Sequence, residues 1–213
     1  MRVFIITLGF HEDHAIRLLT SSGAASDDRV VILTAKPVVP AVRRAYEGLR
    51  AFAMRVGIGD PEIVEVPPEL ALGVESILNV FECANELVLG LSGGMRYLIV
   101  FTLVALVLSG KSATIHIYPE GGDIPEVIIP KDVVASLRRL PTEAELRILK
   151  EVTASPGITD EEVAEKIGRK VKTVKNVVSE LVKAGLVVRR GRRGGLYPTE
   201  WGALIARHVC TYK

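Results

Sequence analysis

The sequence has little of what marks a secreted or disulfide-bonded protein. Only two of its 213 residues are cysteines, Cys83 and Cys210, and they lie far apart. Such cysteines form neither a disulfide framework nor a metal-type pair, so we expect reduced thiols and a cytoplasmic protein. The opening stretch, MRVFIITLGF, is too short for a signal peptide and makes a better first strand.

Unbroken apolar runs and nucleotide-binding fingerprints are also missing. A membrane span needs roughly 20 apolar residues, and the longest candidate, residues 87–109, is interrupted by glycines and by Arg96. No GxGxxG follows the first expected strand, and the GxxxxGK[ST] phosphate loop does not occur. These absences disfavour a membrane protein and an NAD- or ATP-dependent enzyme.

What the sequence does have is a 48% apolar composition, enough for a real core, and an alternation of short apolar runs with helical patterns. We expect strands at 3–7, 30–33, 63–66, 87–91, 113–118 and 127–129. We expect helices at 13–20, 40–56, 68–85 and 95–109. Strands that alternate with helices predict an α/β fold with a mostly parallel, doubly wound sheet.

The ends of the first and fourth strands carry the main candidate site. In doubly wound sheets these strands commonly lie side by side, and ligands bind at their carboxyl ends. Both strands end here in glycine-bearing turns, and the second turn opens a helix, which favours an anion. The candidate ligand-binding residues are Leu8, Gly9, Phe10, His11, Ser92, Gly93, Gly94, Met95 and Arg96. The alternative is that the glycines only close a βα unit.

A metal site at His11 and His14 is a weaker hypothesis. Histidines at i and i+3 share a helix face, but the sequence places no third ligand beside them. An acidic first helical turn is the commoner meaning of such a segment. We therefore predict no metal, no cofactor and no catalytic residue.

Charge divides the chain into two parts. Residues 1–135 hold 11 Lys and Arg against 16 Asp and Glu, net −5, whereas residues 136–213 hold 16 against 9, net +7. We expect a ligand-sensing and dimerisation domain at 1–130, a connecting helix at 131–140 and a DNA-binding domain at 141–213. Capping boxes at Thr142–Glu145 and Thr159–Glu162 predict two helices of the second domain.

A third helix, 171–184, follows a glycine turn and has a basic N-terminal half, with Val174, Val177, Val178, Leu181 and Val182 on its core side. An arginine-rich hairpin at 186–198 comes next, and the series predicts a winged helix-turn-helix. The candidate DNA-binding residues are Lys170, Lys172, Thr173, Lys175, Asn176, Arg189, Arg190, Arg192 and Arg193. The alternative is a charged face that is merely solvated.

With both halves interpreted, the chain resembles the CRISPR-associated transcription regulators of the Csa3 type, which join a CRISPR-associated Rossmann fold (CARF) domain to a winged helix-turn-helix. The resemblance rests on residues 7–10, 92–96, the Glu120-Gly121-Gly122 loop and the basic second domain. It implies an archaeal homodimer of antiviral defence that binds cyclic oligoadenylate, with cyclic tetra-adenylate as the expected regulatory ligand. The ligand would contact residues 8–11 and 93–96, and promoter DNA would be the second partner.

Three functions remain open at this point. The first is a ligand-responsive transcription regulator without enzymatic activity. The second is a ring nuclease that cuts cyclic oligoadenylate, for which the sequence offers no clear acid–base pair. The third is a DNA-binding regulator whose first domain only dimerises.

Overall fold

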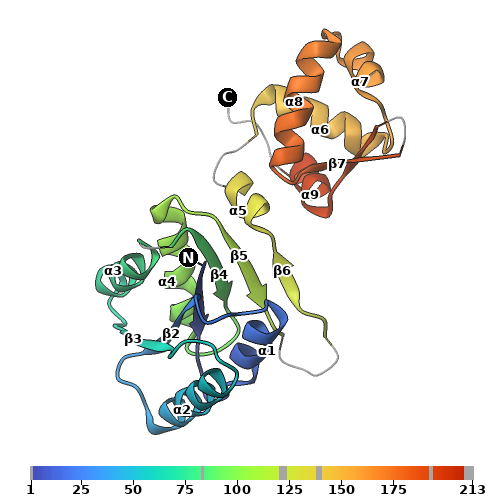
Figure 1. Ribbon diagram of the computed structural model, residues 1–213. Helices are drawn as coiled ribbons and strands as arrows, with labels where there is room; N and C mark the ends of the chain where they lie inside the picture. Colours follow the sequence, from blue (N-terminus) through green and yellow to red (C-terminus); the bar gives the residue numbers. More distant parts are fainter. Residues whose placement is uncertain (1, 83, 120–123, 138–140, 192–193, 209–213) are drawn as a thin grey trace. The chain divides into compact units, whose positions relative to one another are not determined.

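The computed structural model describes residues 2–82, 84–119, 124–137, 141–191 and 194–208 (Figure 1). The chain divides into two compact units, Met1–Lys131 and Asp132–Lys213. Each unit has its own hydrophobic cluster of buried side chains.

The first unit contains a six-stranded sheet with the order β3-β2-β1-β4-β5-β6. All neighbouring strands are parallel except β5 and β6, which are antiparallel. The strands are β1 (Arg2–Thr7), β2 (Arg29–Ala35), β3 (Glu62–Val66), β4 (Glu86–Gly90), β5 (Ala113–Ile117) and β6 (Val127–Ile129). This mostly parallel sheet confirms the predicted fold class, and β1 and β4 are indeed neighbours.

Four helices cover the sheet: α1 (Asp13–Ser21), α2 (Pro40–Arg55), α3 (Leu70–Phe81) and α4 (Arg96–Ser109) (Figure 1). The central strand β1 is buried on both faces, with Val3, Phe4 and Ile5 fully inaccessible. A parallel strand of this kind needs helices on both sides. The side chains of α1 and α2 pack in one cluster with Phe4 and Ile6, while α3 and α4 pack against each other.

Helix α3 is shorter than the expected 68–85. It ends at Phe81, and the ammonium of Lys111 donates hydrogen bonds to the carbonyl oxygens of Phe81, Glu82 and Ala84, at 2.6, 3.0 and 2.9 Å. A lysine near a helix C-terminus satisfies carbonyls that have no intrahelical partner. This cap comes from 30 residues further along the chain, so helical periodicity alone overestimates the helix.

The second unit is a winged helix-turn-helix, which confirms the other half of the predicted fold. Its elements are α5 (Lys131–Leu137), α6 (Glu143–Ala154), α7 (Asp160–Ile167), α8 (Val171–Lys183), β7 (Val187–Arg190), β8 (Gly195–Pro198) and α9 (Glu200–His208). Strands β7 and β8 form an antiparallel pair, the wing. Positions 138–140 of the expected connecting helix lie outside the described residues.

The capping boxes of this unit form as predicted, whereas the predicted apolar side of α8 differs at one residue. Both capping boxes are present, since the hydroxyls of Thr142 and Thr159 accept hydrogen bonds from the backbone N–H groups of Glu145 and Glu162. On α8, however, Val182 is 37% exposed and was wrongly predicted to lie on the core side. The buried stripe is Val174, Val178 and Leu181, and Val182 falls on its flank.

Candidate functional site

The turns after β1 and β4 meet through their backbones. A Cβ atom on Gly9 would lie 2.7 Å from the backbone nitrogen of Gly94, and one on Gly93 would lie 2.9 Å from the carbonyl oxygen of Thr7. Gly94 also has a φ of +81°, in the left-handed region that favours glycine. The two predicted glycine turns are therefore one structural feature, and their glycines are required by the close approach.

A cavity of about 650 Å³ opens beside these turns. Residues 8–11 and 92–95, eight of the nine candidate ligand-binding residues, line it. Its volume is within the range of small-molecule sites, roughly 300–1,000 Å³. The carboxyl ends of β1 and β4 thus provide a preformed concave surface.

Arg96 differs from the other eight candidates. It is the first residue of α4, is exposed, and is not among the residues that line the cavity. The cation that does line it is Lys36, which follows β2. Because β2 is parallel to β1 and adjacent to it, its carboxyl end reaches the same edge of the sheet.

Sequence reasoning missed this third wall of the cavity. It comes from α1, from the segment after β2 and from the start of α2, and consists of His14, Ala35, Lys36, Pro37, Val39 and Val42. The available signal was the position of Lys36 directly after a buried strand. The cavity therefore combines apolar side chains, one ammonium and two imidazoles, His11 and His14.

The cavity has large apolar side chains that are exposed and an imidazole nitrogen that is buried. Phe10 and Met95 are large apolar side chains that are 66% and 60% exposed. The His14 ring stacks on Tyr118 with centroids 5.9 Å apart, and its Nδ1 is buried with no hydrogen-bond partner in the part of the chain that the structure describes. Burial raises the pKa of the Tyr118 phenol. The Ser92 hydroxyl accepts a hydrogen bond of 2.7 Å from the backbone N–H of Tyr118, which joins the glycine turn to the end of β5.

In the second unit, the residues predicted to contact DNA bases lie on α8. Lys172, Thr173 and Asn176 are exposed, as is Lys170, the N-cap residue of the helix. Helix α8 follows α7 across a turn at Gly168, which has a φ of +66°. This arrangement leaves the N-terminal half of α8 available to a groove of DNA.

Two other predicted DNA-binding cations already have acidic partners within the protein. The Nζ of Lys175 lies 2.9 Å from Oε1 of Glu161, and the guanidinium of Arg189 donates to both carboxylate oxygens of Asp160. The hydrogen bond that Lys175 donates to Glu161 is the main cause of the raised pKa of Lys175. Arg190 instead lies over the ring of Tyr197, 5.7 Å from its centroid.

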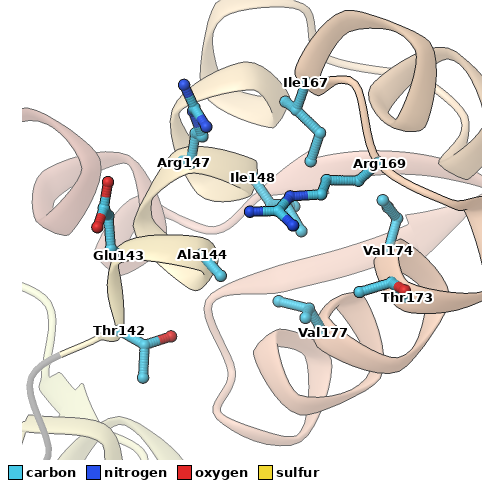
Figure 2. A pocket seen from close by; sticks show the side chains of 10 residues that line it. All are labelled: Thr142, Glu143, Ala144, Arg147, Ile148, Ile167, Arg169, Thr173, Val174 and Val177. Atoms are coloured by element: carbon cyan, nitrogen blue, oxygen red, sulfur yellow. The ribbon is translucent and has the colours of Figure 1, made fainter.

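Arg192 and Arg193, the remaining predicted wing residues, lie outside the described residues. A basic pair that was not predicted lies on the other flank of α8. Arg147 of α6 and Arg169 of the α7–α8 turn line a cavity of about 430 Å³, and Arg169 extends over Ile148 (Figure 2). Arg169 directly precedes Lys170, so the sequence alone could have predicted that Arg169 lies beside α8.

Comparison with known proteins agrees with both halves of this architecture. A family model described as the Csa3 CRISPR-associated Rossmann-like domain matches residues 2–129, more than half of the chain. The chain belongs to this family. A second model, described as winged helix-turn-helix DNA-binding, matches residues 142–188. The chain is therefore a CRISPR-associated Csa3 family member with a DNA-binding winged helix.

Two curated Csa3 proteins related to CRISPR loci are similar over most of their length. The protein of Saccharolobus solfataricus is 28% identical over 194 residues, which covers 90% of this chain and 82% of the relative. That of Thermoproteus tenax is 29% identical over 188 residues, covering 88% and 86%. Each alignment thus includes residues of both units.

Among solved structures, Can2 from Sulfobacillus thermosulfidooxidans in complex with cyclic tetra-adenylate aligns over 97% of this chain and 63% of Can2. The identity is 12% and the TM-score 0.42. The transcriptional regulator PcaV from Streptomyces coelicolor aligns over 32% of this chain and 52% of PcaV, with 30% identity and a TM-score of 0.30.

The Csa3 Rossmann-like domain also has an unusual helix. Helix α4 buries Leu98, Phe101 and Ala105, yet its outer face is equally apolar, with the side chains of Val107 and Leu108 65% and 66% exposed. Val100, Leu103, Val104, Val107 and Leu108 line a shallow groove of about 310 Å³ on this face. We call these five residues the α4 face.

Across the described ranges, His, Cys, Asp and Glu side chains form no group of three that could hold a metal ion, and His11 and His14 gain no third ligand. The described helices also include none that is long and apolar enough to cross a membrane.

Proposed function

We propose that this chain is a ligand-responsive transcription regulator: a cytoplasmic homodimer that binds cyclic oligoadenylate through its Rossmann-like units and double-stranded promoter DNA through its winged helices. The observation that carries the proposal is the cavity formed where the Gly9 and Gly94 turns meet, on the same chain as a winged helix. Cyclic tetra-adenylate is the ligand we expect.

The lining of the cavity suits a ligand that is both aromatic and anionic. The exposed ring of Phe10 offers a stacking surface to a base, since base–aromatic stacking contributes about 1–3 kcal/mol per base. Lys36 supplies positive charge, and α4 begins directly after Met95. Because the first N–H groups of a helix have no intrahelical partner, they favour a phosphate at this end.

The α4 face supports a second copy of the chain as the partner. Covering one exposed valine or leucine side chain contributes about 1.5–3 kcal/mol, so the four exposed members of this face, together with the half-buried Val104, favour an apolar partner. Helix α4 starts at the ligand cavity, and a two-fold contact along it would bring two cavities toward one axis. A cyclic tetranucleotide has the same two-fold symmetry, so each half of the ring would meet an identical set of residues.

Calorimetry with purified full-length protein tests this proposal. We expect saturable binding of cyclic tetra-adenylate with one ring per two chains, and weaker binding of the linear tetranucleotide. No heat at tens of micromolar ligand would remove cyclic tetra-adenylate as the ligand. A stoichiometry of one ring per chain would remove the shared site.

The ring-nuclease alternative gains one observation from the structure, since His11 and His14 line the same cavity. Cleavage would require the 2′-hydroxyl to lose its proton to a base and attack the adjacent phosphorus. The P–O5′ bond would then break, with a proton delivered to O5′ and a 2′,3′-cyclic phosphate left behind. Chromatography of ligand recovered after long incubation distinguishes the two functions: we expect the intact ring, and linear products would favour the nuclease.

A further inference from the structure

The first turn of α7 carries three consecutive carboxylates, and each has a different contact. Asp160 is buried and accepts two hydrogen bonds from Arg189 of the wing. Glu162 completes the capping box with Thr159. Glu161 contacts Lys175, a predicted DNA-binding residue of α8. Arg189 and Lys175 are both predicted DNA-binding residues, but the partner of Arg189 is a buried carboxylate, whereas the partner of Lys175 is exposed.

The Glu161–Lys175 pair lies at the surface. The two side chains are 61% and 51% exposed, and their charged groups are 2.9 Å apart. Exposed ion pairs contribute little to the free energy of unfolding. The Glu161 carboxylate also lies in the first turn of α7, where it interacts favourably with the helix N-terminus whether or not Lys175 is present. The contact with Lys175 is therefore not required for the stability of the helix.

The Glu161–Lys175 pair lies at the part of α8 that is predicted to face DNA. Lys175 precedes Asn176 and lies one turn before Ser179 on the exposed part of α8. A phosphate that approaches Lys175 must also approach the Glu161 carboxylate, which repels it and competes for the same ammonium. The hydrogen bond between the two side chains lowers the pKa of Glu161, so the carboxylate stays charged at neutral pH.

We propose that Glu161 restrains Lys175 and so weakens its contacts with the phosphates of DNA of any sequence. This inference rests on the proposed DNA binding. Sequence-independent affinity comes largely from cations that neutralise phosphates, so a carboxylate beside one of them lowers it.

Binding to a random-sequence DNA duplex, measured over a range of salt concentrations, tests the role of Glu161. For Glu161→Gln we expect affinity to rise about three- to tenfold at low salt, and the slope of log K against log salt to steepen by about 0.9, the value for one added phosphate contact. Lys175→Ala should lower affinity, and Glu161→Gln added to it should bring a smaller gain than in the wild-type protein, because only the direct repulsion of phosphate is then removed. Unchanged affinity in Glu161→Gln would overturn the inference.

A matched pair on the same helix provides the control. Glu180 and Lys183 are also exposed, with Nζ and Oε1 2.8 Å apart, but lie at the C-terminal end of α8. Glu180→Gln removes the same charge and releases a lysine, and we expect a much smaller gain. An equal gain would overturn the inference in favour of a net-charge effect. Failure of the wild-type protein to bind DNA at low salt would instead refute the proposed DNA binding on which it rests.

Discussion

The guanidinium of Arg189 donates two hydrogen bonds to the carboxylate of Asp160, at 2.8 and 2.9 Å. Asp160 is buried, so its carboxylate oxygens rely on Arg189 for these hydrogen bonds. Arg189→Ala should therefore lower the free energy of unfolding by about 1–3 kcal/mol, the usual cost of leaving a buried acceptor without a partner. Denaturant unfolding of the full-length protein measures this loss.

The neighbouring Arg190 is the matched control, because it is exposed and contacts only the face of Tyr197 among the interactions described above. Arg190→Ala should change stability by less than about 0.5 kcal/mol, as surface substitutions usually do, and should weaken DNA binding. If the two variants were equally stable, the wing would not depend on Asp160.

A methyl group at Gly9 should disrupt the ligand cavity. Its Cβ would lie 2.7 Å from the backbone nitrogen of Gly94, so one turn must move. We expect Gly9→Ala to lose about 1–3 kcal/mol of stability, as overpacked sites do, and to bind cyclic tetra-adenylate much more weakly. In Gly59→Ala the added Cβ meets its nearest atoms at 3.8 Å, so both properties should match wild type. Wild-type ligand affinity in Gly9→Ala would show that ligand binds elsewhere.

We expect Lys36, rather than Arg96, to contact the phosphates of the bound ligand. Lys36 lines the cavity, whereas Arg96 does not. A hydrogen bond to a charged group contributes about 1.5–3 kcal/mol, so Lys36→Ala should weaken calorimetric binding of cyclic tetra-adenylate by at least about tenfold. Arg96→Ala should have the smaller effect. A larger loss of affinity in Arg96→Ala than in Lys36→Ala would support the sequence-based prediction that Arg96 binds the ligand.

An acidic residue on the α4 face should separate the proposed dimer. Val107 is 65% exposed within this apolar groove, so Val107→Asp would place a charge between two copies of α4. Light scattering should then give the mass of one chain, against two chains for wild type. Met54→Asp changes a side chain of similar exposure, 62%, on α2 and should remain dimeric. A dimeric Val107→Asp protein would place the interface on another surface.

The sequence was sufficient where structure depends on local patterns. A threonine followed three residues later by glutamate predicts a capping box because all the partners lie within one helical turn, and Thr142 and Thr159 form such boxes. The alternation of strands and helices predicts a doubly wound sheet with the first and fourth strands side by side, and the glycine turns that follow them, at Gly9 and Gly94, do meet.

The contacts that sequence reasoning missed all join distant segments. Lys36 reaches the cavity only because β2 lies beside β1, and Lys111 ends α3 from 30 residues away. Likewise, Lys175 and Glu161 become partners only because α7 packs against α8. Residue type identifies each of these groups as charged, but only the tertiary fold determines which other group it meets.

The most direct test of ligand-responsive regulation is the affinity of the full-length protein for a promoter DNA duplex that it binds, with and without saturating cyclic tetra-adenylate. Coupling between two sites typically changes affinity about 5- to 150-fold, and by linkage DNA must change ligand affinity by the same factor. We predict a change within this range that is lost in Lys36→Ala. Identical DNA affinities with and without bound ligand would contradict the account.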